Sequence, residues 1–72
     1  MDPKSKFQEI AQERLGVTPT YAVIGETGPD HQKEFEVAAQ LNGETVGTGK
    51  GTSKQEAQVQ AAQNALKAKG WE

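Results

Sequence analysis

The amino-acid sequence predicts a small α+β domain in which two helices pack on one face of a three-stranded antiparallel sheet. Apolar residues recur at helical spacing near both ends of the chain, and they alternate with polar residues in its middle. A chain of 72 residues has room for one domain, so residues 1–72 form a single unit of limited stability. The order helix, strand, strand, strand, helix lets both helices cover the same sheet face.

The first predicted helix spans residues 3–15. Asp2 can cap its N-terminus, Pro3 suits the first helical position, and Gly16 is a natural terminating residue. The apolar side chains of this segment share one narrow stripe, formed by Phe7, Ile10, Ala11 and Leu15. We therefore expect an amphipathic helix with this stripe facing the core.

Three strands are predicted, at residues 20–27, 33–41 and 44–51. The first runs toward the turn signal Gly28-Pro29-Asp30, and Asn42-Gly43 is a strong hairpin signal between the second and third. The second strand alternates clearly, with Phe35, Val37, Ala39 and Leu41 on one face and Glu34, Glu36, Ala38 and Gln40 on the other. This pattern predicts a meander with one face against the helices and one face in water.

The second predicted helix spans residues 53–69. Ser53 with Glu56 has the spacing of a capping box, and Gly70 ends the helix. Its buried stripe consists mostly of small side chains, namely Ala57, Ala61, Ala62, Ala65 and Leu66. We interpret the glycines of the third strand as positions where that strand passes close under this helix, except Gly51, which shapes the helix entry.

Composition excludes several classes of function. The chain has no cysteine for a disulfide or thiolate metal site and no apolar run long enough to cross a bilayer, so we expect a soluble, cytoplasmic protein. His31 is the only histidine, and the pair Glu34 and Glu36 suits a solvated strand face, so no catalytic site or cofactor is predicted. The net charge of −2 permits nucleic-acid binding only if the lysines gather on one surface.

Three segments together resemble the double-stranded-RNA-binding domain family, in particular the C-terminal domain of bacterial ribonuclease III. They are Asp2-Pro3-Lys4-Ser5 with Phe7-Gln8-Glu9, then Gly28-Pro29-Asp30-His31, then Gly49-Lys50-Gly51-Thr52-Ser53-Lys54 with Ala57 and Ala61-Ala62. The resemblance covers nearly the whole chain, and it implies that the chain binds double-stranded RNA across two successive minor grooves, over about 16 base pairs.

The resemblance also implies which residues touch RNA. One minor groove would be contacted by Ser5, Gln8, Glu9 and Gln12, which helical spacing independently places on one polar stripe. The second minor groove would receive Pro29, Asp30 and His31. The phosphates between the grooves would be bound by Lys50 and Lys54, with Ser53 and Gln55 adding hydrogen bonds.

The sequence departs from the family at the start of the second helix. Gln55 and Gln58 stand where basic residues are common, which predicts weaker binding and a shallower salt dependence than a fully basic member shows. Lys67 and Lys69 suit the negative end of the helix dipole better than an RNA contact.

The resemblance further implies that the chain is an excised, monomeric piece of a larger and dimeric enzyme, with Met1 added as a start residue. Magnesium would serve only the nuclease domain, which has no counterpart here. The alternative is a domain of the same fold used for protein–protein contact, through Val59 and Trp71, although Trp71 more often closes a small core. A small enzyme is the third and least supported possibility.

Overall fold

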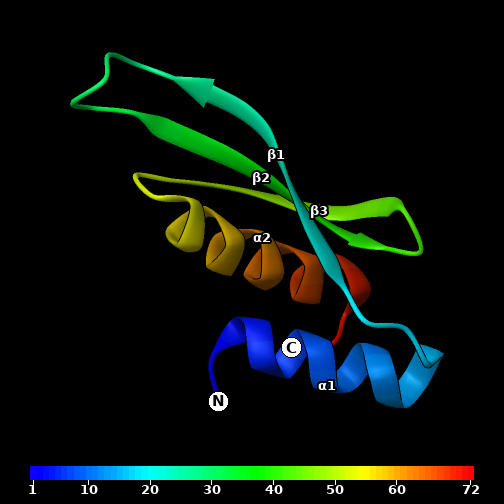
Figure 1. The fold of residues 1–72 in the computed structure, drawn as a ribbon. Coiled ribbons are helices and arrows are strands. Elements are labelled where there is room, and N and C mark those ends of the chain that lie inside the picture. The colour runs from blue at the N-terminus through cyan, green and yellow to red at the C-terminus, as the bar shows by residue number, and fades with distance from the viewer.

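The computed structural model describes all 72 residues and has two layers, a three-stranded antiparallel sheet and a pair of helices that both lie on one of its faces (Figure 1). The elements are α1 (Pro3–Leu15), β1 (Thr20–Thr27), β2 (Glu34–Leu41), β3 (Glu44–Gly51) and α2 (Lys54–Lys69). The predicted fold class is confirmed. Two elements begin one residue later than predicted: β2 at Glu34, and α2 at Lys54, because Ser53 is the N-cap.

The sheet is a meander with the order β1-β2-β3. Asn42 and Gly43 connect β2 to β3 with φ angles of 53° and 78°, the left-handed values that a two-residue hairpin of the primed type requires. The pairing of β1 with β2 shifts register between Val23 and Gly25, which leaves Ile24 without a cross-strand partner. Val23 and Ile24 are about half exposed on this edge strand.

The core lies between the helices and the inner sheet face. Val37, Ala39 and Leu41 of β2 are buried there together with Phe7 and Leu66, the largest buried helical side chains. Trp71 closes one side of this core, since its ring centroid lies 5.9 Å from that of Phe7. The prediction that Trp71 is a closing residue is therefore confirmed.

Two side chains differ from their predicted environments. Leu15 is 50% exposed although it was predicted to face the core, because the C-terminal end of α1 projects beyond α2, against which α1 packs (Figure 1). Ala38 lies on the open sheet face but is fully buried, because its small side chain sits between the cross-strand neighbours Ala22 and Thr48.

The glycines of β3 allow α2 to lie directly on the strand. A Cβ atom on Gly47 would lie 2.5 Å from the amide nitrogen of Ala65, and one on Gly51 would lie 2.7 Å from that of Ala57. Gly49, between them, is equally enclosed by the helix backbone. The predicted close approach is confirmed, but Gly51 is no exception to it, because it faces the helix in the same way.

Candidate nucleic-acid interface

The polar face of α1 presents Ser5, Gln8, Glu9 and Gln12 together. All four are exposed and line one shallow depression, whereas Phe7 and Ala11 on the opposite side of the helix are buried. The prediction that these four polar side chains share a face is confirmed. Their hydroxyl, amide and carboxylate groups can donate to and accept from 2′-hydroxyls and base edges in a shallow minor groove.

Capping interactions orient part of this face. The backbone N–H of Ser5 donates to Asp2 Oδ1 at 3.0 Å, and the Ser5 hydroxyl donates to Asp2 Oδ2 at 2.9 Å. These bonds hold the pKa of Asp2 below its ordinary value, the backbone bond contributing most. Because the Ser5 hydroxyl is already a donor, its oxygen remains available to an external group as an acceptor. Gln12 is oriented in turn by donating to Thr18 Oγ1 at 3.2 Å.

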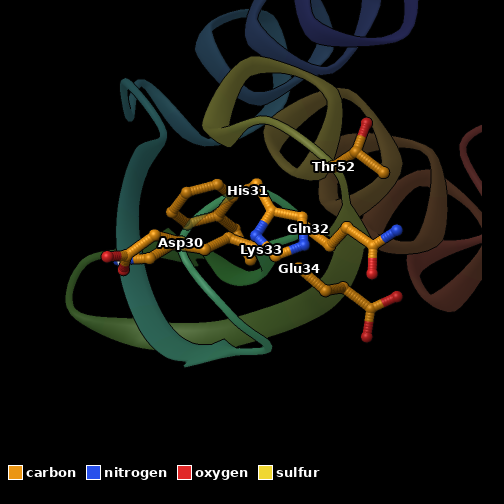
Figure 2. Close-up of a pocket in the computed structure, with 7 residues that line it drawn as sticks. Asp30, His31, Gln32, Lys33, Glu34 and Thr52 are labelled. Carbon is orange, nitrogen blue, oxygen red and sulfur yellow. The ribbon is translucent and has the colours of Figure 1, made fainter.

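The loop between β1 and β2 carries Pro29, Asp30 and His31, all of which are exposed. Inside the loop, the backbone N–H of Gln32 donates to the carbonyl of Pro29 at 2.9 Å, which closes a turn. The side chains of Asp30, His31 and Gln32 project from this turn and line an open depression, with Phe35 the one apolar residue among those that line it (Figure 2). Thr52 borders the same depression from the entry to α2.

The start of α2 lies on the other side of that depression. Ser53 accepts a hydrogen bond from the backbone N–H of Glu56 at 3.1 Å, so it is the N-cap as predicted. The return bond differs from a standard capping box, because the Glu56 carboxylate accepts from the N–H and hydroxyl of Thr52 at 3.4 and 3.2 Å. Lys54 and Gln55 are exposed in the first turn, where the helix dipole favours an anion.

Lys54 is placed next to the loop by an aromatic contact. Its Nζ atom lies 5.8 Å from the centroid of the Phe35 ring, within the range of a cation–π interaction. Phe35 also lines the depression that Asp30 and His31 border. The structure therefore brings together the loop and the first turn of α2, two of the three segments that the sequence predicted to touch RNA.

Lys50 was predicted to join Lys54 beside the phosphates, and the structure places it elsewhere. It is paired with Glu36 in the sheet and lines a small depression with Glu34 and Glu36 on the open face. Its neighbours Gly49 and Gly51 face α2, so strand alternation turns Lys50 the opposite way. The predicted grouping of Lys50 with Lys54 is wrong, whereas the predicted position of Glu34 and Glu36 on the open face is confirmed.

Gln58 has a structural role that sequence reasoning missed. It accepts a hydrogen bond from Lys4 Nζ at 2.6 Å, and this bond ties α1 to α2. The same Nζ atom lies 5.1 Å from the centroid of the Tyr21 ring. Burial is the main reason that the pKa of Tyr21 is raised, with the negative charge of Asp2 a smaller cause. Gln58, which stands where a basic residue was expected, thus helps to join α1 to α2.

The three segments are arranged along one end of an elongated domain. The β1–β2 loop, the start of α2 and the N-terminal part of α1 all lie toward the same end of the molecule, whose principal extents are 40 × 24 × 16 Å (Figure 1). The Asn42-Gly43 hairpin, with Glu44, lies at the opposite end. Neither helix is long and apolar enough to cross a membrane.

An open polar surface on an α-β-β-β-α scaffold suits contact with the grooves and phosphates of a nucleic acid. Comparison with known families makes the assignment specific. Residues 3–69 match the model of the double-stranded RNA binding motif, so the chain belongs to that family and its partner is double-stranded RNA.

The curated relatives are longer proteins. Ribonuclease 3 of a Nitratiruptor species is 54% identical over 66 residues, which are 92% of this chain and 29% of that protein. Ribonuclease 3 of Campylobacter concisus is 52% identical over 65 residues, which are 90% of this chain and 29% of that protein. The chain therefore spans about three-tenths of the length of these relatives.

Solved structures share the fold. A structure of Arabidopsis HYL1, described in connection with miRNA processing, is 30% identical with a TM-score of 0.79, and the match covers 94% of this chain and 96% of that one. Dicer from Pichia stipitis is 31% identical with a TM-score of 0.72, and the match covers 90% of this chain and 31% of that one.

Proposed function

We propose that the domain is the substrate-binding module of a ribonuclease III-type endoribonuclease and that it recognises duplex RNA by its A-form shape. The observation that carries the proposal is that the N-terminal part of α1, the β1–β2 loop and the start of α2 lie toward one end of the domain (Figure 1). Relatives named Ribonuclease 3 support the identity of the parent enzyme. We further propose that this parent is a cytoplasmic homodimer and that the isolated domain is a monomer.

In this proposal the α1 face and the loop enter two successive minor grooves. Gln8, Glu9 and Gln12, with the Ser5 hydroxyl oxygen, would contact 2′-hydroxyls and base edges in the first groove. Pro29, Asp30 and His31 would enter the second groove, about one turn of the duplex away. Because these groups address 2′-hydroxyls and groove shape, the domain would bind RNA in preference to DNA and with little sequence preference.

The first turn of α2 would bind the phosphates between the two grooves. Lys54 would contribute the charge, and Ser53 and Gln55 would add hydrogen bonds where the helix dipole is positive. Lys50 would not take part in this interface, because it faces the other side of the sheet. With so few basic groups at the phosphates, the log–log dependence of affinity on salt should be no steeper than about −4.

Fluorescence anisotropy with a labelled RNA duplex of about 20 base pairs tests this proposal, with duplex DNA and single-stranded RNA as competitors. Lys54→Ala should weaken binding about tenfold or more, because a hydrogen bond to a charged group contributes about 1.5–3 kcal/mol. Lys50→Ala is the matched control, and it should bind like the wild-type domain. Equal losses in both variants would contradict the proposed phosphate site.

Binding by the isolated domain should need no metal ion, since we assign magnesium to the nuclease domain of the parent enzyme. Chelation with EDTA should therefore leave the anisotropy titration unchanged. The alternative function, protein contact, has less support, because Trp71 packs on Phe7 in the core and leaves Val59, which is 38% exposed, as the remaining candidate. Failure to bind duplex RNA at low salt, with self-association that Val59→Lys abolishes, would favour that alternative.

A further inference from the structure

The base of the β1–β2 loop is closed by an ion pair. Glu26, near the end of β1, lies opposite Phe35 in the sheet register, and its carboxylate accepts a hydrogen bond from Lys33, the last residue before β2. Within the loop, Gly28 has a φ of 94°, and a side chain there would collide with the carbonyl of Gln32. The loop is therefore held both by its own turn and by the side chains at its base.

Lys33 also reaches toward the tip of the loop. Its Nζ atom lies 4.0 Å from Asp30 Oδ1, so one ammonium group bridges the end of β1 and the segment proposed to enter the second minor groove. Glu26 and the fully exposed Asp30 therefore neutralise part of the charge of Lys33 at the surface. This arrangement suits a positioning residue better than a phosphate contact.

The Glu26 carboxylate also interacts electrostatically with Lys54 at the start of α2. Its pKa lies below the ordinary value chiefly because Lys33 donates a hydrogen bond to it and places a charge beside it, with Lys54 a smaller cause. Lys54 in turn lies over Phe35, the cross-strand partner of Glu26. The exposed carboxylate is thus paired with the loop lysine and lies within the electrostatic influence of the lysine proposed to bind phosphate.

We propose that Glu26 and Lys33 form a brace that fixes the reach of the β1–β2 loop, and that this brace makes tight binding depend on a duplex long enough to present a second minor groove. The inference rests on the proposed function of the loop. A loop held in its bound conformation loses less entropy on binding than a mobile one, so the brace would add affinity without touching RNA.

The direction in which one substitution changes the affinity for RNA distinguishes this role from a simple effect of charge. Glu26→Gln removes a negative charge beside Lys54, so charge alone predicts tighter binding to a polyanion. Loss of the brace predicts weaker binding, by about twofold to fivefold on a duplex of about 20 base pairs, because the loop side chains must then be ordered on binding and an exposed ion pair contributes only modestly to that order. On a duplex of about 10 base pairs, too short for two successive grooves, the affinity should not fall.

A matched control removes the same charge from the open face. Glu36→Gln should bind the long duplex as tightly as the wild-type domain, or slightly more tightly. The conservative exchange Lys33→Arg keeps a cation between Glu26 and Asp30, and it should bind the long duplex like the wild-type domain. Because the Lys33 and Glu26 side chains are 34% and 43% exposed, their pair adds little stability, and the melting temperature should barely change.

Backbone order parameters measured by NMR give a second readout that does not depend on RNA. Residues 29–32 should become more mobile in Glu26→Gln and keep their order in Lys33→Arg. The inference is overturned if the wild-type domain binds duplex RNA but Glu26→Gln binds the long duplex equally or more tightly. Absence of duplex binding by the wild-type domain would instead overturn the proposed function, and the inference with it.

Discussion

The contact between β3 and α2 leads to a quantitative prediction for Gly49→Ala. A Cβ atom at this position would lie 2.6 Å from the carbonyl carbon of Gln60 and 2.7 Å from the carbonyl oxygen of Ala57, and closer still to the amide nitrogen of Ala61. Ordinary van der Waals contact begins near 3.4 Å. All three neighbouring atoms belong to the helix backbone, so no side-chain rotation can relieve the overlap. The helix must retreat by more than about 0.8 Å, the difference between 3.4 and 2.6 Å, because the amide nitrogen of Ala61 lies closer than either carbonyl atom.

Such a retreat loosens the small-residue contacts that form much of the core. Overpacking costs about 1–3 kcal/mol, and occasionally more where rigid groups collide. We expect Gly49→Ala to lower the free energy of unfolding by about 3 kcal/mol, because the added Cβ atom collides with the helix backbone. A domain of 72 residues has a total stability of about 4–11 kcal/mol, so the variant should lose a large part of its free energy of unfolding.

Urea denaturation measures this loss, followed by circular dichroism and by the fluorescence of Trp71, the only tryptophan. With a slope of about 1 kcal/mol per molar urea, the midpoint should fall by about 3 M or the variant should be unfolded without urea. Gly25→Ala is the matched control, since its Cβ would lie 3.4 Å from the Glu36 side chain. That variant should be neutral or slightly more stable. Equal midpoints for the two variants would refute the close approach.

Two further predictions concern the ends of the helices. Gln58→Lys should remove the hydrogen-bond acceptor for Lys4 and add a positive charge in the first turns of α2. Binding to duplex RNA should therefore tighten. In an anisotropy titration, the log–log dependence of affinity on salt should steepen by about 0.9. Asp2→Asn should reduce the acid sensitivity of the domain, because Asn keeps the capping oxygen but does not titrate. The folded-state pKa of Asp2 is lowered from 3.8, so its contribution is complete above that value and disappears as the pH falls through the folded-state pKa.

Each of these predictions has a simple contrary result. An unchanged salt slope in Gln58→Lys would mean that the side chain at this position does not face the RNA phosphates. Thermal unfolding at about pH 6 and about pH 2.5 tests the reduced acid sensitivity predicted for Asp2→Asn. If acid lowers the melting temperature equally in the wild-type domain and in this variant, the predicted role of the cap is contradicted.

Much of the fold follows from short-range patterns in the chain. Three patterns each involve only a few neighbouring residues: the helical spacing of Phe7 and Ala11, the alternation along β2 and the Asn42-Gly43 turn. They therefore predict the helix, the strand and the hairpin without tertiary information. The polar face of α1 was predictable for the same reason, because residues three and four apart on a helix must share a face.

The side of the sheet on which Lys50 lies could also have been predicted from the sequence. If Gly49 and Gly51 both lie under α2, strand alternation turns Lys50 toward the open face, but the prediction treated Gly51 as part of the helix entry. The error came from grouping Lys50 with Lys54 by nearness in the chain, whereas the side of a strand depends on the parity of the position.

Other features depend on how distant segments pack. The bond from Lys4 to Gln58 joins residues 54 positions apart, and the contact of Lys54 with Phe35 depends on where α2 begins relative to β2. Leu15 fits the apolar stripe of its helix yet stays half exposed, since α1 extends beyond the helix that would cover it. Local periodicity specifies which face of an element is apolar. The partners that each face and each polar side chain meet are specified by the length and relative placement of the packed elements, which no short stretch of sequence encodes.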